Sequence, residues 1–241
     1  MTGMKDKITK ETIYKLLGIK DIETYKVPGK LFQILLNKSE RVKVFEKFLS
    51  VSDVLTKDWF FDYFQTEQAE MNRQKQDLTP NNLSKLLAQL SHNDWKWNNS
   101  GIRLDVGAGT GTLTIAKWVE DQVKHDSLVY KPHNYLYFCE EKSDQAIPFL
   151  IFNLAIRGMN AVVWHGDSLT RKCKGVFFIE NCLDDAHSFS DVNIMPYTKE
   201  VKEYFSVSDG SKERYPKHIE TFLKIETTLN GKTTALVYGD K

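Results

Sequence analysis

A glycine-rich segment constrains the fold of this chain more than any other part of the sequence. Gly107, Gly109 and Gly111 occupy alternate positions in LDVGAGTGTL, between a short apolar run at 102–106 and an amphipathic pattern at 112–123. Glycine has no Cβ atom, so the chain turns tightly and a ligand is able to approach the backbone beside the positive end of the following helix. The segment therefore predicts a buried strand, a nucleotide-type binding loop and a helix in succession.

Strand-like and helix-like segments alternate from this loop onward. The predicted elements are strands at 102–106, 134–139, 161–164 and 175–179, helices at 112–123, 144–157 and 215–229, and a last strand in TTALVYG. Such alternation is typical of an α/β fold with a mostly parallel, doubly wound sheet. We expect this sheet to be truncated after its fifth strand.

The N-terminal region, 1–76, predicts helices only. Thr9 and Gly18 have the positions of an N-cap and a C-cap around one helical pattern, and Asp58 precedes another as a capping acid. Aromatic residues at helical spacing are expected to pack against the next domain rather than stack on nucleic-acid bases. They are Trp59, Phe60, Phe61, Tyr63 and Phe64. We expect an N-terminal helical bundle followed by a cofactor-binding domain at 77–241.

The composition excludes several classes of protein. A chain of 241 residues that is 41% hydrophobic is able to bury a core, and no run approaches the roughly 20 apolar residues of a membrane span. The opening MTGMKDKITKET is polar, so we expect a cytoplasmic protein with neither signal peptide nor membrane anchor. The net charge of +1 indicates no general affinity for nucleic acid, and RKCK at 171–174 is expected to be a solvated turn.

The cysteines and histidines predict no metal site. Cys139, Cys173 and Cys182 lack CxxC spacing, which argues against a disulfide framework and against structural zinc. We expect all three to be buried small apolar residues, and the six histidines show no metal-ligating pattern.

The glycine loop resembles the first motif of S-adenosylmethionine-dependent methyltransferases. DVGAGTG has GxGxG spacing after Asp105, whereas dinucleotide-binding folds have GxGxxG. The resemblance implies that Glu140 and Glu141, at the end of the second strand, accept hydrogen bonds from the ribose hydroxyls of the cofactor. It also implies that Asp167, in HGDSL, contacts the adenine amine, and that the cofactor lies across the carboxyl ends of the strands near a switch point of the sheet.

Two further segments are similar to adenine-specific DNA methyltransferases (N-6 DNA methylases), including the modification subunits of type I restriction systems. KQDLTP resembles the FTP or YTP element that helps to hold the methionine part of the cofactor. Thr79 and Pro80 match that element, and Leu78 replaces its aromatic residue. The run EEKSDQAIPFLIFNLAIRGMNAVVWHGDSL follows the family's order and favours Glu141 over Glu140 as the ribose ligand.

The catalytic motif of that family is altered here. The family places Asp or Asn, two prolines and an aromatic residue after the fourth strand, where the first residue accepts hydrogen bonds from the target amine and the ring stacks on the extruded base. In GVFFIENCLDD, Asn181 takes the first position, and Cys182, Leu183 and Asp184 replace the prolines and the ring. Asn181 is the candidate amine acceptor, and a turn residue is the alternative interpretation.

These patterns support two functions and disfavour a third. The resemblance, which covers about 58–239, implies an S-adenosylmethionine-binding methyltransferase that acts on the adenine exocyclic amine in DNA without a metal. The alternative is a catalytically inactive, methyltransferase-like binding or regulatory module, encoded by a phage or another mobile element. We expect no target-recognition domain, so a partner subunit would supply sequence readout. The glycine spacing disfavours a nicotinamide-dependent oxidoreductase.

Overall fold

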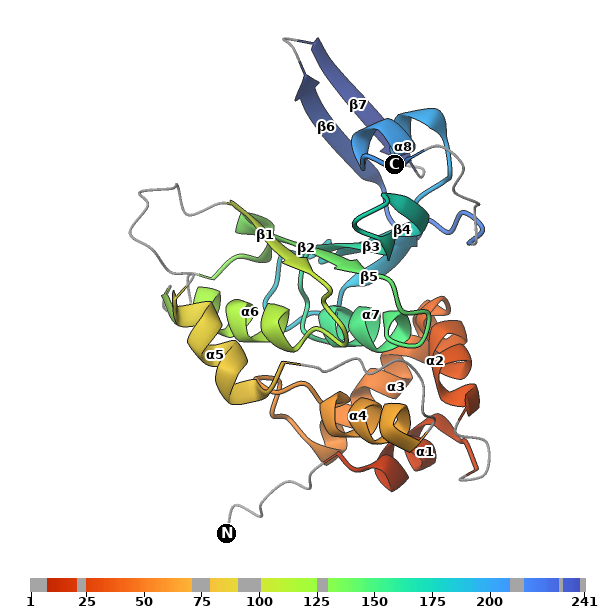
Figure 1. Ribbon diagram of the computed structural model, residues 1–241, viewed down its shortest axis with the longest axis vertical. Coiled ribbons are helices and arrows are strands. Elements are labelled where there is room, and N and C mark those ends of the chain that lie inside the picture. Colours follow the sequence, from red (N-terminus) through yellow and green to blue (C-terminus); the bar gives the residue numbers. More distant parts are fainter. Residues whose placement is uncertain are drawn as a thin grey trace.

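The computed structural model of this chain describes residues 8–20, 25–70, 79–90, 101–124, 130–208, 215–229 and 232–238. A five-stranded sheet forms the centre of the fold (Figure 1). Its strands are β1 (Gly101–Val106), β2 (Tyr135–Glu141), β3 (Ala161–Asp167), β4 (Lys172–Glu180) and β5 (Asp191–Ile194), with a 3-10 turn at Pro132–Asn134 before β2. They lie in the order β1-β2-β3-β4-β5, and only β4 runs against the direction of the others. The expected α/β fold with a mostly parallel sheet is confirmed.

The sheet is not doubly wound, which corrects the prediction. Helices α6 (Thr112–Lys124) and α7 (Ile147–Ile156) connect β1 to β2 and β2 to β3, and both lie on the same face (Figure 1). Crossovers between parallel strands are right-handed, so successive crossovers reach opposite faces only where the strand order reverses. The order of these strands does not reverse, so β1 is an edge strand of this sheet rather than one side of a switch point.

The short connection from β3 to β4 decides the direction of β4. Only residues 168–171 separate the two strands, whereas a parallel crossover needs a dozen or more residues. β4 therefore returns beside β3 as a hairpin, with Ala161 opposite Ile179 and Asp167 opposite Lys172. The sequence analysis did not identify which strand departs from the parallel direction, although the turn at 168–171 is too short for a parallel crossover.

Four helices from the N-terminal region pack beneath α6 and α7 (Figure 1). They are α1 (Lys10–Leu17), α2 (Val27–Leu35), α3 (Lys38–Val51) and α4 (Phe61–Glu70). As predicted, Thr9 caps α1 by accepting a hydrogen bond from the Thr12 amide, and Gly18 ends α1 with φ +67°.

Aromatic side chains join these helices to the sheet. The ring of Phe60 lies 4.9 Å from that of Phe149 and 5.0 Å from that of Phe152, both in α7, and Tyr63 lies 5.5 Å from Phe149. Every residue of α7 is buried, because the sheet covers one side of this helix and the N-terminal helices cover the other. The predicted packing is confirmed for Trp59, Phe60, Tyr63 and Phe64, whereas Phe61 is only half-buried. One hydrophobic core extends from α1 to β5.

The opposite face of the sheet is only partly covered. Trp164, Val176 and Phe205 form a second cluster there, beside the short helix α8 (Lys199–Tyr204). Nearer β1, three apolar side chains on this face are exposed: Ile102 (68%), Leu104 (64%) and Val106 (58%). The strand predicted at 102–106 is confirmed, but its predicted burial is wrong, because Arg103 and Asp105 on the other face are only half-buried.

The C-terminal residues form a separate hairpin that projects from the body of the protein (Figure 1). It consists of β6 (Leu223–Leu229) and β7 (Lys232–Tyr238), which pair antiparallel with each other. The predicted helix at 215–229 is wrong, because Ile225, Thr227 and Thr228 are β-branched and favour an extended chain. The predicted last strand, TTALVYG, lies in this hairpin and does not join the main sheet.

All three cysteines are free, but only two match the predicted burial. Cys139 and Cys173 are buried, whereas Cys182 is exposed in the turn after β4. Within the described ranges, no helix is long and apolar enough to cross a membrane.

Candidate functional site

The glycine loop, residues 107–111, joins β1 to α6 at the carboxyl edge of the parallel strands. Gly107, Gly109 and Gly111 have φ angles of +78°, +57° and +96°, values that side-chain-bearing residues rarely adopt. The amides of Gly107 and Ala108 donate to the Glu140 carbonyl oxygen at 2.8 and 3.0 Å. The Gly111 amide donates to the Ala108 carbonyl oxygen at 2.8 Å, so the loop folds tightly onto the end of β2.

Two of the predicted cofactor residues bond to the loop and its helix from within the protein. Glu141 accepts hydrogen bonds from the Gly109 amide at 2.7 Å and from the Ser143 amide at 2.6 Å. Asp105 accepts a hydrogen bond from the Thr114 hydroxyl at 2.6 Å. Burial, together with the charge of Glu141, raises the pKa of Asp105 despite this hydrogen bond. The site therefore has carboxylates where a phosphate-binding loop has free amides.

Asp58 supports the loop from the side of the N-terminal helices. One carboxylate oxygen accepts from the Phe60 amide at 2.9 Å, in the turn before α4, and from the Asn153 side chain at 2.8 Å. The other oxygen accepts from the hydroxyls of Thr110 and Thr112. Asp58 thus connects the start of α4, the glycine loop and α7, a role that sequence analysis did not identify.

Glu140 and Asp167 are each paired with a long basic side chain. Glu140 Oε1 lies 2.7 Å from Arg171 Nη1, and Asp167 Oδ2 lies 2.8 Å from Lys142 Nζ. The hydrogen bond from Lys142 and those from two backbone amides of the following turn lower the pKa of Asp167 to about 2. Lys142 is exposed, so its ion pair with Asp167 is open to solvent, whereas Glu140 is buried and its partner Arg171 is half-buried.

Asn181 lies at the opposite edge of the sheet from the glycine loop. It follows β4, which runs antiparallel to β3. Its backbone amide donates at 2.7 Å to Oδ1 of Asn160, the residue just before β3. The seven residues of β3 separate this position from the carboxyl edge, a span of roughly 20 Å at about 3.3 Å per residue. The structure therefore does not bring the candidate catalytic residue together with the candidate cofactor residues.

The side chain of Asn181 bonds to its own turn and to the segment after α7. It is buried, and Nδ2 donates to the carbonyl oxygens of Gly158 at 2.9 Å and Asp185 at 2.7 Å. Asn181 Oδ1 accepts from the Asp185 amide at 3.4 Å. These contacts match the alternative interpretation of Asn181 as a turn residue.

Thr79 and Pro80 directly precede helix α5 (Asn81–Leu90). The Ser84 amide donates to the Pro80 carbonyl oxygen at 2.9 Å, and the Ser84 hydroxyl donates to the Thr79 carbonyl oxygen at 3.3 Å. Helix α5 packs on α6. Leu78 lies outside the described residues.

A buried polar chain beside the site had no signal in the sequence. His165 is fully buried, with Nε2 3.0 Å from Asp144 Oδ1 and Nδ1 2.9 Å from the Tyr215 hydroxyl. Lys174 Nζ lies 2.6 Å from the same Asp144 oxygen. Residues 171–174 are therefore not a solvated turn, because Arg171 and Lys174 pair with acids and β4 begins at Lys172. The participants come from distant segments, so only the fold brings them together.

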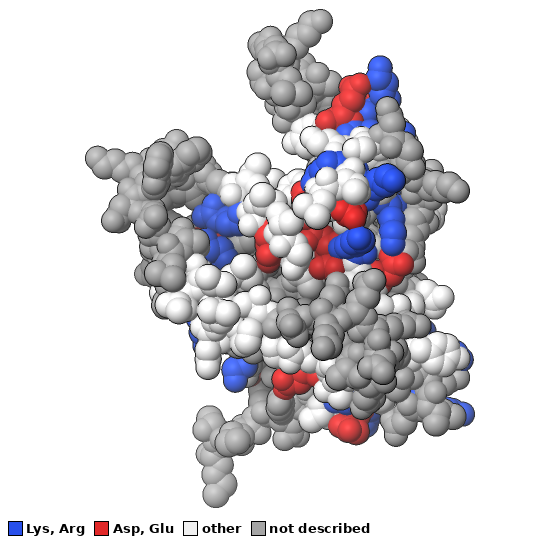
Figure 2. All heavy atoms as spheres, in the orientation of Figure 1, with Lys and Arg blue, Asp and Glu red and all other residues white. Residues whose placement is uncertain are grey.

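The surface and the comparisons with known proteins identify no ligand directly. On the face shown in Figure 2, the described basic and acidic side chains are intermixed rather than gathered into a continuous basic surface. Among the residues that the structure describes, no three His, Cys, Asp or Glu side chains are grouped to hold a metal ion.

Comparison with protein-family models, curated proteins and solved structures finds no match to this chain.

The glycine loop supports a prediction about stability. A Cβ atom at Gly111 would lie 2.9 Å from Leu150 Cδ1, whereas one at Gly107 would have no atom within 4 Å. Gly107→Ala is expected to cost about 1–2 kcal/mol through backbone strain alone. Gly111→Ala, which adds a steric conflict in the core, is expected to cost about 2–4 kcal/mol. Urea denaturation of the two variants checks this order, and equal costs would contradict it.

Proposed function

We propose that this chain is a methyltransferase-like module that binds S-adenosylmethionine at the carboxyl edge of β1–β3 without itself methylating an adenine amine. One observation carries the proposal. The glycine loop and the acids Glu140, Glu141 and Asp167 lie at the same edge of the sheet, while Asn181 lies at the other edge.

The charge of the site favours this cofactor over a dinucleotide. The amides of Gly107, Ala108, Gly109 and Gly111 all have acceptors within the protein, so they offer no cradle for a pyrophosphate. S-adenosylmethionine has no phosphate, and its sulfonium and ammonium groups are cationic. Its ribose hydroxyls and adenine amine are hydrogen-bond donors, which carboxylates accept well. Gly107 is exposed and has free space beside its Cα atom, where a ligand is able to approach the backbone.

The position of Asn181 supports the non-catalytic form of the proposal. In-line transfer requires the acceptor amine and the sulfonium methyl to be held about 3–3.5 Å apart. Asn181 is a strand length away, and its side-chain amide donates to the carbonyl oxygens of Gly158 and Asp185. It therefore does not orient an amine at the glycine loop. We therefore favour a binding or regulatory role over methyl transfer by this chain.

Titration calorimetry with S-adenosylmethionine tests the proposal. We expect binding by the wild-type chain and a loss of affinity of about tenfold in Asp167→Ala, because a hydrogen bond to the ligand is removed. Asp185→Ala is the matched control, since this exposed acid lies at the opposite edge beside Asn181 and should leave the affinity unchanged.

A second assay separates binding from catalysis. Incubation of the chain with labelled cofactor and mixed genomic DNA is expected to give no transfer of label. Absence of S-adenosylmethionine binding by the folded wild-type protein would refute the cofactor assignment. Transfer of label to DNA by this chain alone would instead refute the non-catalytic role and favour the methyltransferase interpretation.

A further inference from the structure

Among the described residues β1 pairs with β2 alone, and its other edge combines an apolar face with an open groove. Ile102, Leu104 and Val106 are exposed on one face of this edge strand. On the other side, a cavity of about 410 Å³ lies between β1, α5 and α6. Residues 103–105 all line it, and because successive side chains of a strand point to opposite faces, the cavity extends along the strand edge. Three exposed leucines of α5 lie on one stripe of that helix: Leu83, Leu86 and Leu87.

We propose that this edge is an interface with a second copy of the chain, in which β1 pairs antiparallel with β1 of the other copy about a twofold axis at Leu104. The sequence of the strand is complementary to itself in this register. Ile102 lies opposite Val106, Arg103 opposite Asp105, and Leu104 opposite its own copy. The two apolar faces join, and the two opposite-charge pairs are on the cavity side.

The charges single out this register. A shift of two residues places Arg103 opposite Arg103, or Asp105 opposite Asp105, on the twofold axis, where like charges repel. A shift of one residue places apolar side chains opposite charged ones and breaks the match between the two faces. Asp121 fixes Arg103 toward the α6 side, since Arg103 Nε lies 2.8 Å from Asp121 Oδ2. The interface would also cover the edge of β1, since proteins rarely leave a strand edge exposed to solvent.

Light scattering after size exclusion tests the interface with charge variants of Leu104. We expect the wild-type chain to have twice the mass of one copy. Leu104→Glu and Leu104→Lys each place two like charges on the twofold axis, so each is expected to raise the dissociation constant at least about a hundredfold and to run as a monomer. An equal mixture of the two variants, carrying tags of different mass, is expected to recover a dimer that contains one of each.

Controls keep the test independent of folding and of the proposed cofactor. Leu104 is exposed, so both variants should keep the wild-type circular dichroism spectrum and a single cooperative unfolding transition, with a melting temperature lowered only by the loss of the dimer. Leu183→Glu changes a leucine that is 76% exposed in the turn after β4, outside the proposed interface, and should leave the dimer intact. A wild-type chain that is monomeric at every attainable concentration overturns the proposal. A dimer that withstands both Leu104 charges, or a mixture that does not associate, also overturns it.

Discussion

Replacement of Asp58 by alanine is expected to lower the free energy of unfolding by about 3–5 kcal/mol. The substitution leaves the Phe60 amide, the Asn153 side chain and the hydroxyls of Thr110 and Thr112 without this acceptor. Buried donors that lose their acceptor cost about 1–3 kcal/mol each where no other acceptor is near, and hydroxyl rotation limits the sum. Urea denaturation monitored by fluorescence measures the change.

The neighbouring cation increases the expected cost. Arg157 is almost fully buried and donates to the carbonyl oxygens of Leu55, Lys57 and Asn153. Burial lowers the pKa of Arg157 to about 10, and the charge of Asp58 opposes this shift. Without Asp58 the guanidinium loses the carboxylate that compensates for its burial.

Two variants make the Asp58 prediction decisive. Glu46→Ala removes an exposed acid from α3 and is expected to change stability by no more than about 0.5 kcal/mol. Asp58→Asn keeps one acceptor oxygen and is expected to lie between wild type and Asp58→Ala, which preserves the test if the alanine variant does not fold. A cost for Asp58→Ala similar to that of Glu46→Ala would show that the loop does not depend on this carboxylate.

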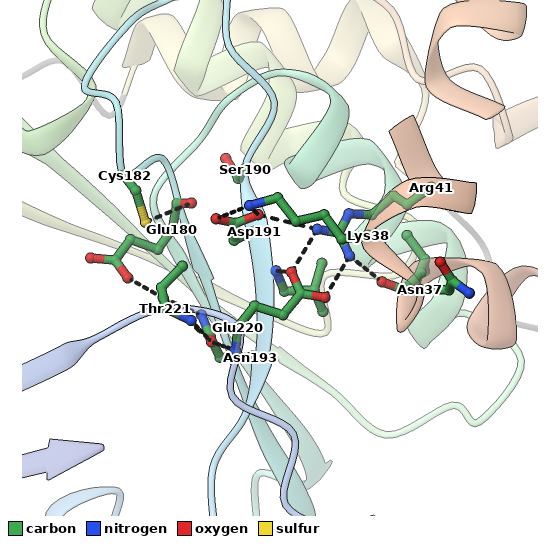
Figure 3. Close-up of polar contacts among 12 residues, drawn as sticks. Asn37, Lys38, Arg41, Glu180, Cys182, Ser190, Asp191, Asn193, Glu220 and Thr221 are labelled. Atoms are coloured by element: carbon green, nitrogen blue, oxygen red, sulfur yellow. Dashed lines mark hydrogen bonds and ion pairs between the residues drawn. The ribbon is translucent and has the colours of Figure 1, made fainter. Parts of the chain in front are cut away.

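Arg41 is the second position where a large effect is expected. Figure 3 shows its side chain extending from α3 to acids near β5. Arg41 is 1% exposed and donates to both carboxylate oxygens of Glu220 at 2.9 and 2.6 Å, to Asp191 Oδ1 at 3.3 Å and to the Leu35 carbonyl oxygen. Glu220 in turn accepts from the Val192 amide at 3.1 Å. This cluster attaches the segment before the C-terminal hairpin to the sheet.

Substitution Arg41→Met is expected to cost about 3–5 kcal/mol at neutral pH, because it leaves two buried carboxylates without their shared cation. Lys38→Met is the matched control in the same cluster. Lys38 Nζ lies 2.7 Å from Asp191 Oδ1, but its side chain is 60% exposed, so its loss is expected to cost no more than about 1 kcal/mol. Similar costs for the two variants, measured by denaturation, would contradict the importance of burial in this cluster.

The stability difference between wild type and Arg41→Met is expected to depend on pH. Burial raises the pKa of Glu220, but hydrogen bonds from Arg41 and His218 and the charge of Arg41 outweigh it, so the net pKa is lowered. The ionised carboxylate therefore stabilises the fold above its unfolded pKa, and that contribution is lost as the pH falls through the folded pKa. The stability difference between wild type and Arg41→Met should narrow below about pH 5. A difference that stays constant down to acid unfolding would contradict this assignment.

Local features of the sequence predicted local structure correctly where neighbouring residues decide it. The caps at Thr9 and Gly18 and the strand, glycine loop and helix around Gly107 depend on contacts within a few residues. The segment at 215–229 was misassigned because β-branched residues in a weakly amphipathic run favour an extended chain once a partner strand is available.

Strand order and the assembly of a site were decided by the tertiary structure. The order of strands and acids along the chain was enough to predict that Glu141 and Asp167 end successive parallel strands, and hence that they share an edge with the glycine loop. It did not determine the place of Asn181, because that depends on the strand beside which β4 pairs and in which direction. Strand pairing depends on which distant segments bury their side chains and form backbone hydrogen bonds with each other. In the sequence, only the short turn at 168–171 indicates that β4 pairs antiparallel with β3. The contacts of Arg41 and Asp58 likewise depend on segments that the folded core brings together.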